Sequence, residues 1–197
     1  MSKLIDGSRS RSTKLNAGFT LVELMVTVAV VVILITIGIP GFNALIQRYT
    51  SESSIDMLHK DMHFARAEAV SLGKRVTVCH LSSTNECDGN WLDGISVFVD
   101  DGDNVGELDG GELVLAQSAP LGSENSFKDS TRDRVTFTPD GLSAGFAATF
   151  VFCPSSGDNK YARGIILSNI GRARATIDAN EDGYHEDSNG NILTCNE

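Results

Sequence analysis

The sequence predicts an α+β fold in which one long N-terminal helix, with a membrane-spanning first half, packs on a C-terminal antiparallel β domain. Three observations support this prediction. The chain has 197 residues, room for one modest domain plus an accessory element. Residues 19–39 form an apolar run with a single charged residue, Glu23. From residue 75 onward, short β-type runs alternate with turn signals, and helix formers are sparse.

The apolar run is about long enough to cross a bilayer as a helix, which needs about 20 residues. Residues 1–18 hold four basic residues and one acid, whereas the whole chain has a net charge of −10. The positive-inside tendency therefore keeps residues 1–18 in the cytoplasm and sends the acidic remainder to the outer side of the membrane. The run continues as a helical pattern instead of ending in a small-residue cleavage site, so we expect it to be retained.

The helix should continue as an amphipathic segment that covers the β domain. Apolar residues recur there at spacings of three and four. Gly73 offers a C-terminal stop, and Pro40 is expected to break or kink the helix because proline lacks a backbone donor. We therefore expect a helix over residues 19–73 and a β-rich domain over residues 74–197. The apolar stripe consists of Ile55, Leu58, Met62, Ala65, Ala69 and Leu72.

Seven β-type runs are predicted in the domain, and they favour one long helix laid against antiparallel strands. They cover residues 76–79, 95–99, 112–117, 134–137, 147–152, 164–167 and 174–177.

Four cysteines follow the apolar run, and an even number suits two disulfides in an oxidising compartment. Three pairings are possible. We favour Cys79 with Cys87, since a short polar loop separates them, and Cys153 with Cys195, which would tie down the C-terminal tail. Cysteine use and charge thus agree on the topology.

We expect a glutamate inside a membrane span to have an ion-pair partner or a functional role, because an ionised carboxylate there costs about 2.5 to 3.5 kcal/mol. Glu23 lies in the hexapeptide Gly-Phe-Thr-Leu-Val-Glu at positions 18–23, between the basic leader and the apolar run. This hexapeptide resembles the prepilin peptidase signature of type IV pilins. The resemblance implies cleavage between Gly18 and Phe19, methylation of the Phe19 amine, and pairing of Glu23 with the N-terminal amine of a neighbouring subunit.

Segments of the domain resemble the GspH/FimT branch of minor pilins: residues 65–70, 78–79, 91–94, 98–100 and 137–141. The resemblance implies a non-enzymatic, type IV pilin-like subunit without a cofactor, in a type IV pilus or a type II secretion pseudopilus, acting in filament initiation or the tip complex. Its implied partners are other major and minor pilins or pseudopilins, the prepilin peptidase and methyltransferase, and the inner membrane. The alternative is a plain anchored periplasmic protein, which would have no task for Glu23.

A cluster of four basic residues lies within 15 positions without an acid: Lys160, Arg163, Arg172 and Arg174. Alternation places Arg172 and Arg174 on one side of a strand, where they could grip successive phosphates. The motif Gly-Arg-Ala-Arg at 171–174 resembles the one associated with DNA binding in FimT-type minor pilins of naturally competent bacteria. DNA capture is thus the alternative function, against a structural arginine pair that the acidic tail satisfies.

Two acidic segments partly fit calcium loops. Residues 101–106 with Glu112 have Val105 at the fifth ligand position, so we expect an acidic hairpin loop. Residues 178–183 open such a loop, but Asn189 occupies the twelfth position, so we expect a solvated tail.

The remaining motifs favour structural roles. His59 and His63 are spaced to share a metal but lack the glutamate of a zinc-protease helix, so we expect a solvated or filament-facing pair and no metal. Residues 141–145 match the hydrolase elbow pattern but lead into another strand-like run. Trp91 is expected in the core. No segment predicts catalysis.

Overall fold

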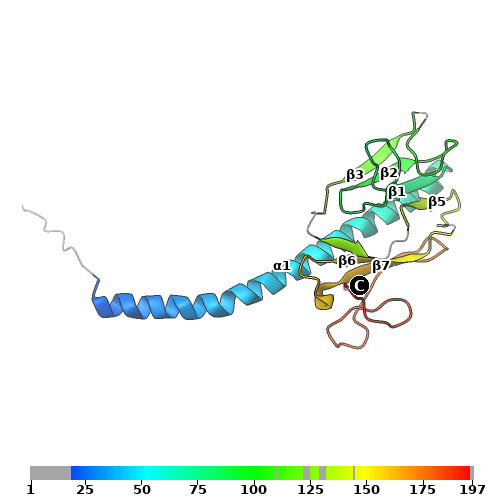
Figure 1. The fold of residues 1–197 in the computed structure, drawn as a ribbon. Coiled ribbons are helices and arrows are strands. Elements are labelled where there is room, and N and C mark those ends of the chain that lie inside the picture. The colour runs from blue at the N-terminus through cyan, green and yellow to red at the C-terminus, as the bar shows by residue number, and fades with distance from the viewer. Residues whose placement is uncertain (1–18, 110, 122–124, 129–131, 144, 196–197) are drawn as a thin grey trace, which may run out of the picture. The chain divides into compact units, whose positions relative to one another are not determined.

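The computed structural model describes residues 19–109, 111–121, 125–128, 132–143 and 145–195. The chain forms two compact units, residues 1–43 and residues 44–197. Helix α1 (Leu21–Leu72) contributes to both units, and all strands belong to the second (Figure 1).

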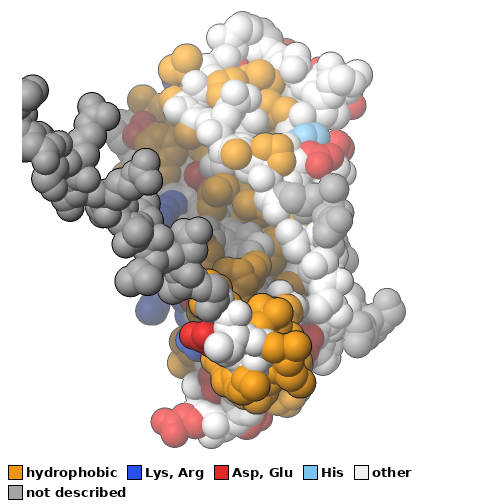
Figure 2. Space-filling model, turned by 90° about the vertical axis from the view of Figure 1, so that its left-hand side faces the viewer, with side chains coloured by type: hydrophobic (Ala, Val, Ile, Leu, Met, Phe, Trp, Pro, Cys, Tyr) orange, Lys and Arg blue, Asp and Glu red, His pale blue; other side chains and the backbone are white. Residues whose placement is uncertain are grey.

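In the first unit, α1 is capped at its start and apolar on all sides. The Thr20 side chain accepts a hydrogen bond from the Glu23 amide at 3.2 Å, as an N-cap residue does. Every residue from 19 to 39 is exposed, and hydrophobic side chains gather over this part of the helix in Figure 2. The segment is long and apolar enough to cross a membrane.

The expected break at Pro40 is absent, since α1 stays helical through residue 40. Proline removes one backbone donor from the helical ladder, and the hydrogen bonds on either side of it are enough to keep the helix continuous. The helix ends at Leu72, where Gly73 adopts a φ of 64° and the Lys74 amide donates to the Ala69 carbonyl at 3.3 Å. Glycine is the residue that takes this left-handed conformation without strain, so the predicted stop is confirmed.

Two antiparallel sheets of four strands form the rest of the second unit (Figure 1). The first has the order β3-β2-β1-β5 and the second the order β4-β6-β7-β8. Strands 76–79 and 95–99 match the prediction, and the others shift by one or two residues. The short strand β4 and the 3-10 turn η1 (Asn159–Tyr161) were not predicted. The strands are β1 (Val76–Cys79), β2 (Ile95–Val99), β3 (Val114–Ser118), β4 (Ser126–Lys128), β5 (Val135–Phe137), β6 (Ala148–Cys153), β7 (Arg163–Leu167) and β8 (Ala173–Ala175).

One hydrophobic core joins both sheets to the second half of α1. Trp91 lies in this core, as predicted: its ring packs edge-to-face on Phe150 with centroids 5.2 Å apart, and its indole N–H donates to the Arg132 carbonyl at 3.0 Å. Each large buried side chain contributes about 1.5 to 3 kcal/mol. From α1 the core takes Ile55, Leu58, Met62, Ala65 and Ala69, which are five of the six residues of the predicted stripe.

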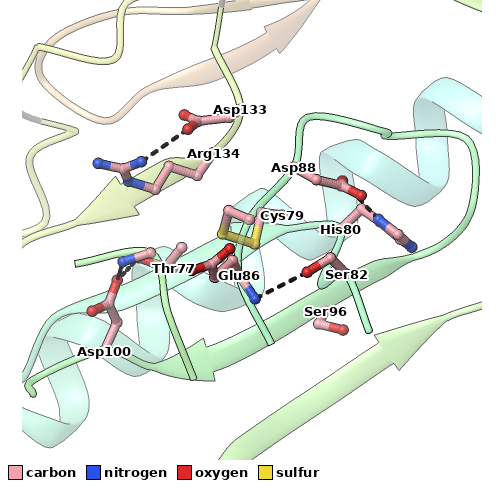
Figure 3. The surroundings of a disulfide bond; sticks show 12 residues. Thr77, Cys79, His80, Ser82, Glu86, Asp88, Ser96, Asp100, Asp133 and Arg134 are labelled. Atoms are coloured by element: carbon pink, nitrogen blue, oxygen red, sulfur yellow. Dashed lines mark hydrogen bonds and ion pairs between the residues drawn. A yellow bond between two sulfur atoms is a disulfide. The ribbon is translucent and has the colours of Figure 1, made fainter. Parts of the chain in front are cut away.

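Two disulfides join the predicted pairs. Cys79 and Cys87 close a loop beside an ion pair in which His80 Nδ1 lies 2.8 Å from Asp88 Oδ1 (Figure 3). Cys153 at the end of β6 bonds to Cys195, so the acidic tail is held against the second sheet.

The acidic segment between β2 and β3 is a hairpin loop, as expected. Glu112 Oε1 accepts hydrogen bonds from the amides of Asp101 and Gly102 at 2.8 and 2.7 Å, and Oε2 accepts one from the Asp109 amide at 3.2 Å. The carboxylate thus serves backbone donors that the turn would leave unpaired.

Candidate functional site

The first turn of α1 presents an isolated carboxylate. Phe19 is 84% exposed, and Glu23 lies four positions later in the first turn. Its neighbours Leu21, Val22 and Leu24 are apolar and exposed, and no ion pair between described residues involves Glu23. Gly18, the expected cleavage residue, lies outside the described residues. None of the residues that the structure describes therefore neutralises this carboxylate.

Two arginines lie at the start of β8, the edge strand of the second sheet: Arg172 directly precedes the strand and Arg174 is its middle residue. Arg172 and Arg174 are both exposed, while Ala173 between them is 6% exposed and belongs to the core. This is the alternation that the sequence predicts. Among the ion pairs of the described residues, none involves either guanidinium. The pair is therefore free to meet an external anion.

Gly171 allows the tight turn that delivers these arginines. Its φ is 73°, and a Cβ at this position would lie 2.1 Å from the Gly141 carbonyl oxygen. The Gly171 amide donates to the Ser168 carbonyl at 2.8 Å, closing the turn between β7 and β8. Only glycine combines this conformation with such close approach of another backbone.

Arg66 on α1 fixes this turn to the helix. Its Nε donates to the Gly141 carbonyl at 2.9 Å, and its Nη2 donates to the Ile170 carbonyl at 3.1 Å. Both acceptors lie more than 70 positions away in the sequence. The sequence reading missed this positioning role, although Arg66 lies in the segment 65–70 that carries the family resemblance.

The other two basic residues of the predicted set differ from each other in exposure. Arg163 is 8% exposed; its Nη1 donates to the carbonyls of Lys160 and Ala162 at 3.0 and 2.8 Å, and Nη2 lies 3.7 Å from Glu52. Burial lowers the pKa of this guanidinium, and Glu52 opposes the shift. Lys160 is exposed, but its Cε lies about 4.0 Å from the place of a Cβ on Gly183, beside the acidic tail. Burial thus sets Arg163 apart from the predicted set, while Lys160, Arg172 and Arg174 are exposed.

The acidic tail contains a compact carboxylate cluster. Oxygens of Asp178, Asp182 and Glu186 lie within 4.8 Å of one another. Asp178 accepts from the amides of Asp182 and Gly183 at 3.1 and 2.8 Å, and Glu186 accepts from the Ala179 amide at 2.9 Å. These bonds hold the loop together, and Glu186 rather than residue 189 completes the group.

The two histidines of α1 face one another and strand β8. Their Nε2 atoms lie 3.1 Å apart, and His59 Nε2 lies 3.3 Å from the Ala173 carbonyl oxygen. Burial lowers the pKa of the His63 imidazole, and His59 and Arg66 lower it further, while the Ala173 carbonyl acts in the opposite direction. The carbonyl that His59 contacts belongs to Ala173, the residue between the two arginines.

Ser143, the central residue of the elbow-like motif, is fully buried. Its hydroxyl donates to the Ser168 carbonyl at 2.7 Å, so it supports the β7–β8 turn and is not presented as a nucleophile. The segment lies between β5 and β6, without the strand-to-helix turn that a hydrolase elbow requires.

Comparison with known proteins agrees with this geometry. The family model described as Type II transport protein GspH matches residues 55–171, and that described as Prokaryotic N-terminal methylation motif matches residues 13–39. The search of curated proteins found no match.

Two crystal structures of the type IV minor pilin FimU from Pseudomonas aeruginosa share the fold. One is 22% identical with a TM-score of 0.54, covering 76% of this chain and 97% of FimU. The other is 23% identical with a TM-score of 0.50, covering 74% and 99%. Because the GspH match spans more than half of the residues and the long helix and antiparallel sheets match a type IV pilin, the chain belongs to the GspH family of pilin-type structural subunits.

Proposed function

We propose that this chain is a membrane-anchored minor subunit of a type IV pilus or type II secretion pseudopilus, which acts in filament initiation or the tip complex. The prepilin peptidase would cleave between Gly18 and Phe19 and methylate the new amine, and other pilins would be the partners. The observation that carries the proposal is Glu23, which has no ion pair among the described residues and lies in an otherwise apolar, fully exposed helix segment.

Assembly would neutralise the Glu23 carboxylate and would cover the apolar surface that a single subunit leaves exposed. An ionised carboxylate inside the membrane costs about 2.5 to 3.5 kcal/mol, and the amine of a neighbouring Phe19 would neutralise it. The apolar surface around Glu23 would pack against the same segment of other subunits. A plain anchor would gain nothing from keeping this charge.

Replacing Glu23 by Gln tests the proposal in the producing bacterium. If the ion pair offsets about 2.5 to 3.5 kcal/mol, its loss should reduce incorporation into sheared filaments by about two orders of magnitude, while the membrane pool remains. Glu68→Gln is the matched control, because it removes the same charge from the part of the same helix that follows the apolar segment. Equal incorporation of Glu23→Gln and wild type would refute the assembly role of Glu23.

Capture of extracellular DNA is the second candidate function, favoured by Arg172 and Arg174, which are exposed and form no ion pair within the described part of the chain. Two adjacent guanidinium groups can bind successive phosphates without reading sequence. The acidic tail opposes this role, because it brings negative charge close to the same sheet.

The DNA hypothesis is tested by duplex binding across a salt series. Each phosphate contact contributes about −0.9 to the slope of log K against log salt, so Arg172→Ala/Arg174→Ala should reduce the slope by about 1.8. Arg48→Ala is the control, since Arg48 is an exposed arginine already paired with Glu52 at 2.8 Å. If the double variant binds DNA as the wild type does, Arg172 and Arg174 do not capture DNA, and their role is structural.

A further inference from the structure

We propose that His59, His63 and the backbone carbonyl of Ala173 form a binding site for a divalent transition metal of the Cu²⁺ or Zn²⁺ class, which would link α1 to β8. The proposal is independent of the filament role and of DNA binding. It differs from the expectation of a merely solvated histidine pair, because the third donor lies 114 positions from His59.

The donor atoms already have the spacing of adjacent metal ligands. The two Nε2 atoms are 3.1 Å apart, and His59 Nε2 is 3.3 Å from the Ala173 oxygen. For metal–ligand bonds of about 2.1 Å, these separations correspond to angles at the metal of about 95° and about 105°. Such angles lie between octahedral and tetrahedral values, so a metal could be held with little movement of the backbone.

The rings are oriented for chelation. The two Nε2 atoms lie 3.1 Å apart, closer than the ring centroids at 4.4 Å, so the Nε2 edges are turned toward each other and two neutral imidazoles can hold only one proton between these atoms. A metal would take the place of that proton and would use both lone pairs. The His59 ring is half-buried and the His63 ring exposed, so the remaining coordination positions would face solvent and could take water or an anion.

The donor atoms select the kind of metal. Ca²⁺ and Mg²⁺ depend on carboxylate oxygens, and this site would offer two imidazole nitrogens and one carbonyl oxygen instead. Imidazole suits Cu²⁺ and Zn²⁺, and Cu²⁺ has the highest affinity of the first-row divalent ions. The charged residues of α1 around the pair are of both signs: Asp56, Lys60, Asp61 and Arg66.

The test uses the full processed chain in detergent, with both disulfides intact and a purification tag that contains no histidine. Cu²⁺ binding is followed by electron paramagnetic resonance and Zn²⁺ binding by calorimetry. The expected result is one ion per chain, with two coordinated nitrogens in the Cu²⁺ spectrum. His63→Gln should leave one nitrogen and weaken affinity at least about ten-fold, since even the loss of supporting residues around a metal costs 10- to 100-fold.

Two controls separate this site from others. His80→Gln removes an imidazole that pairs with Asp88, and Asp182→Asn disrupts the carboxylate cluster of the tail; neither should change the nitrogen count or the affinity. Excess Zn²⁺ should also raise the melting temperature of the wild type and of both controls, and at the same Zn²⁺ concentration it should raise that of His63→Gln by less, because the stabilisation falls as the affinity falls. Unchanged binding by His63→Gln, loss of binding in Asp182→Asn, or no binding by the wild type would overturn the proposal.

Discussion

Removing the Cys153–Cys195 disulfide should destabilise the second unit more than removing Cys79–Cys87, although each bond joins one buried and one half-buried cysteine. In the chain-entropy account, a cross-link stabilises by restricting the unfolded chain, and the effect grows with the loop it closes. The two loops span 42 and 8 residues. The corresponding contributions are about 4 kcal/mol and about 2.5 kcal/mol at 25 °C.

The comparison uses the double variants Cys153→Ala/Cys195→Ala and Cys79→Ala/Cys87→Ala of residues 44–197, so that neither has a free thiol. Equilibrium unfolding in urea can be followed by fluorescence, because Trp91 is the only tryptophan and is buried. Since both variants lose similar buried volume, the difference in unfolding free energy isolates the loop term, about 1.5 kcal/mol. Equal losses, or a larger loss for the short loop, would refute the reasoning.

Three further predictions concern single positions. Gly171→Ala should destabilise the second unit by at least about 1 to 3 kcal/mol, and Gly190→Ala should destabilise it by less. Both glycines have a positive φ, but only at residue 171 would the new Cβ lie against another backbone. The urea midpoints of the two variants check this order. Arg163→Ala should lower the free energy of unfolding by about 1 to 3 kcal/mol, since it leaves the Lys160 and Ala162 carbonyls without their donor. Arg172→Ala/Arg174→Ala should change it by no more than about 0.5 kcal/mol. Similar losses in the two variants would contradict the division between buried and surface arginines. Burial raises the pKa of Asp61, and its hydrogen bond from Ser118 opposes the shift, so the wild type loses stability as pH rises through the folded-state pKa. Asp61→Asn should therefore be the more stable protein at pH 7, with the difference vanishing below the ordinary carboxyl pKa; a pH series of unfolding curves checks the sign.

Local signals in the sequence predicted the elements whose formation is decided locally. Gly73 ends α1 where the apolar stripe ends, and the β-branched runs of β1 and β2 coincide with the observed strands. Strand β4 has only the residues Ser126–Lys128, too few to show alternation, and it exists because β6 pairs with it. At Pro40 the helix does not break, because the helical bonds on both sides outweigh one missing donor.

Parts of the candidate site depend on the order of the strands. Four basic residues close in sequence gave no sign that β7 is interior to its sheet while β8 is the edge. That order buries Arg163 and exposes Arg172 and Arg174. Likewise, the spacing of His59 and His63 could not show the Ala173 carbonyl, and Arg66 could not be linked to Gly141 and Ile170 before the turn was placed.

The residues that clamp β8 and its turn to α1 also determine when the domain can fold. His59 meets Ala173 across 114 positions, and Arg66 meets Ile170 across 104. If the chain crosses the inner membrane from its N-terminal anchor outward, the amphipathic half of α1 emerges long before β7 and β8. The apolar stripe of α1, including Leu58 and Met62, would remain exposed to solvent during that interval. Contacts between residues so far apart in the sequence slow folding, and exposed apolar surface favours aggregation. We therefore expect newly exported subunits to need a periplasmic chaperone, and chains truncated before residue 163 to be degraded instead of stored in the membrane.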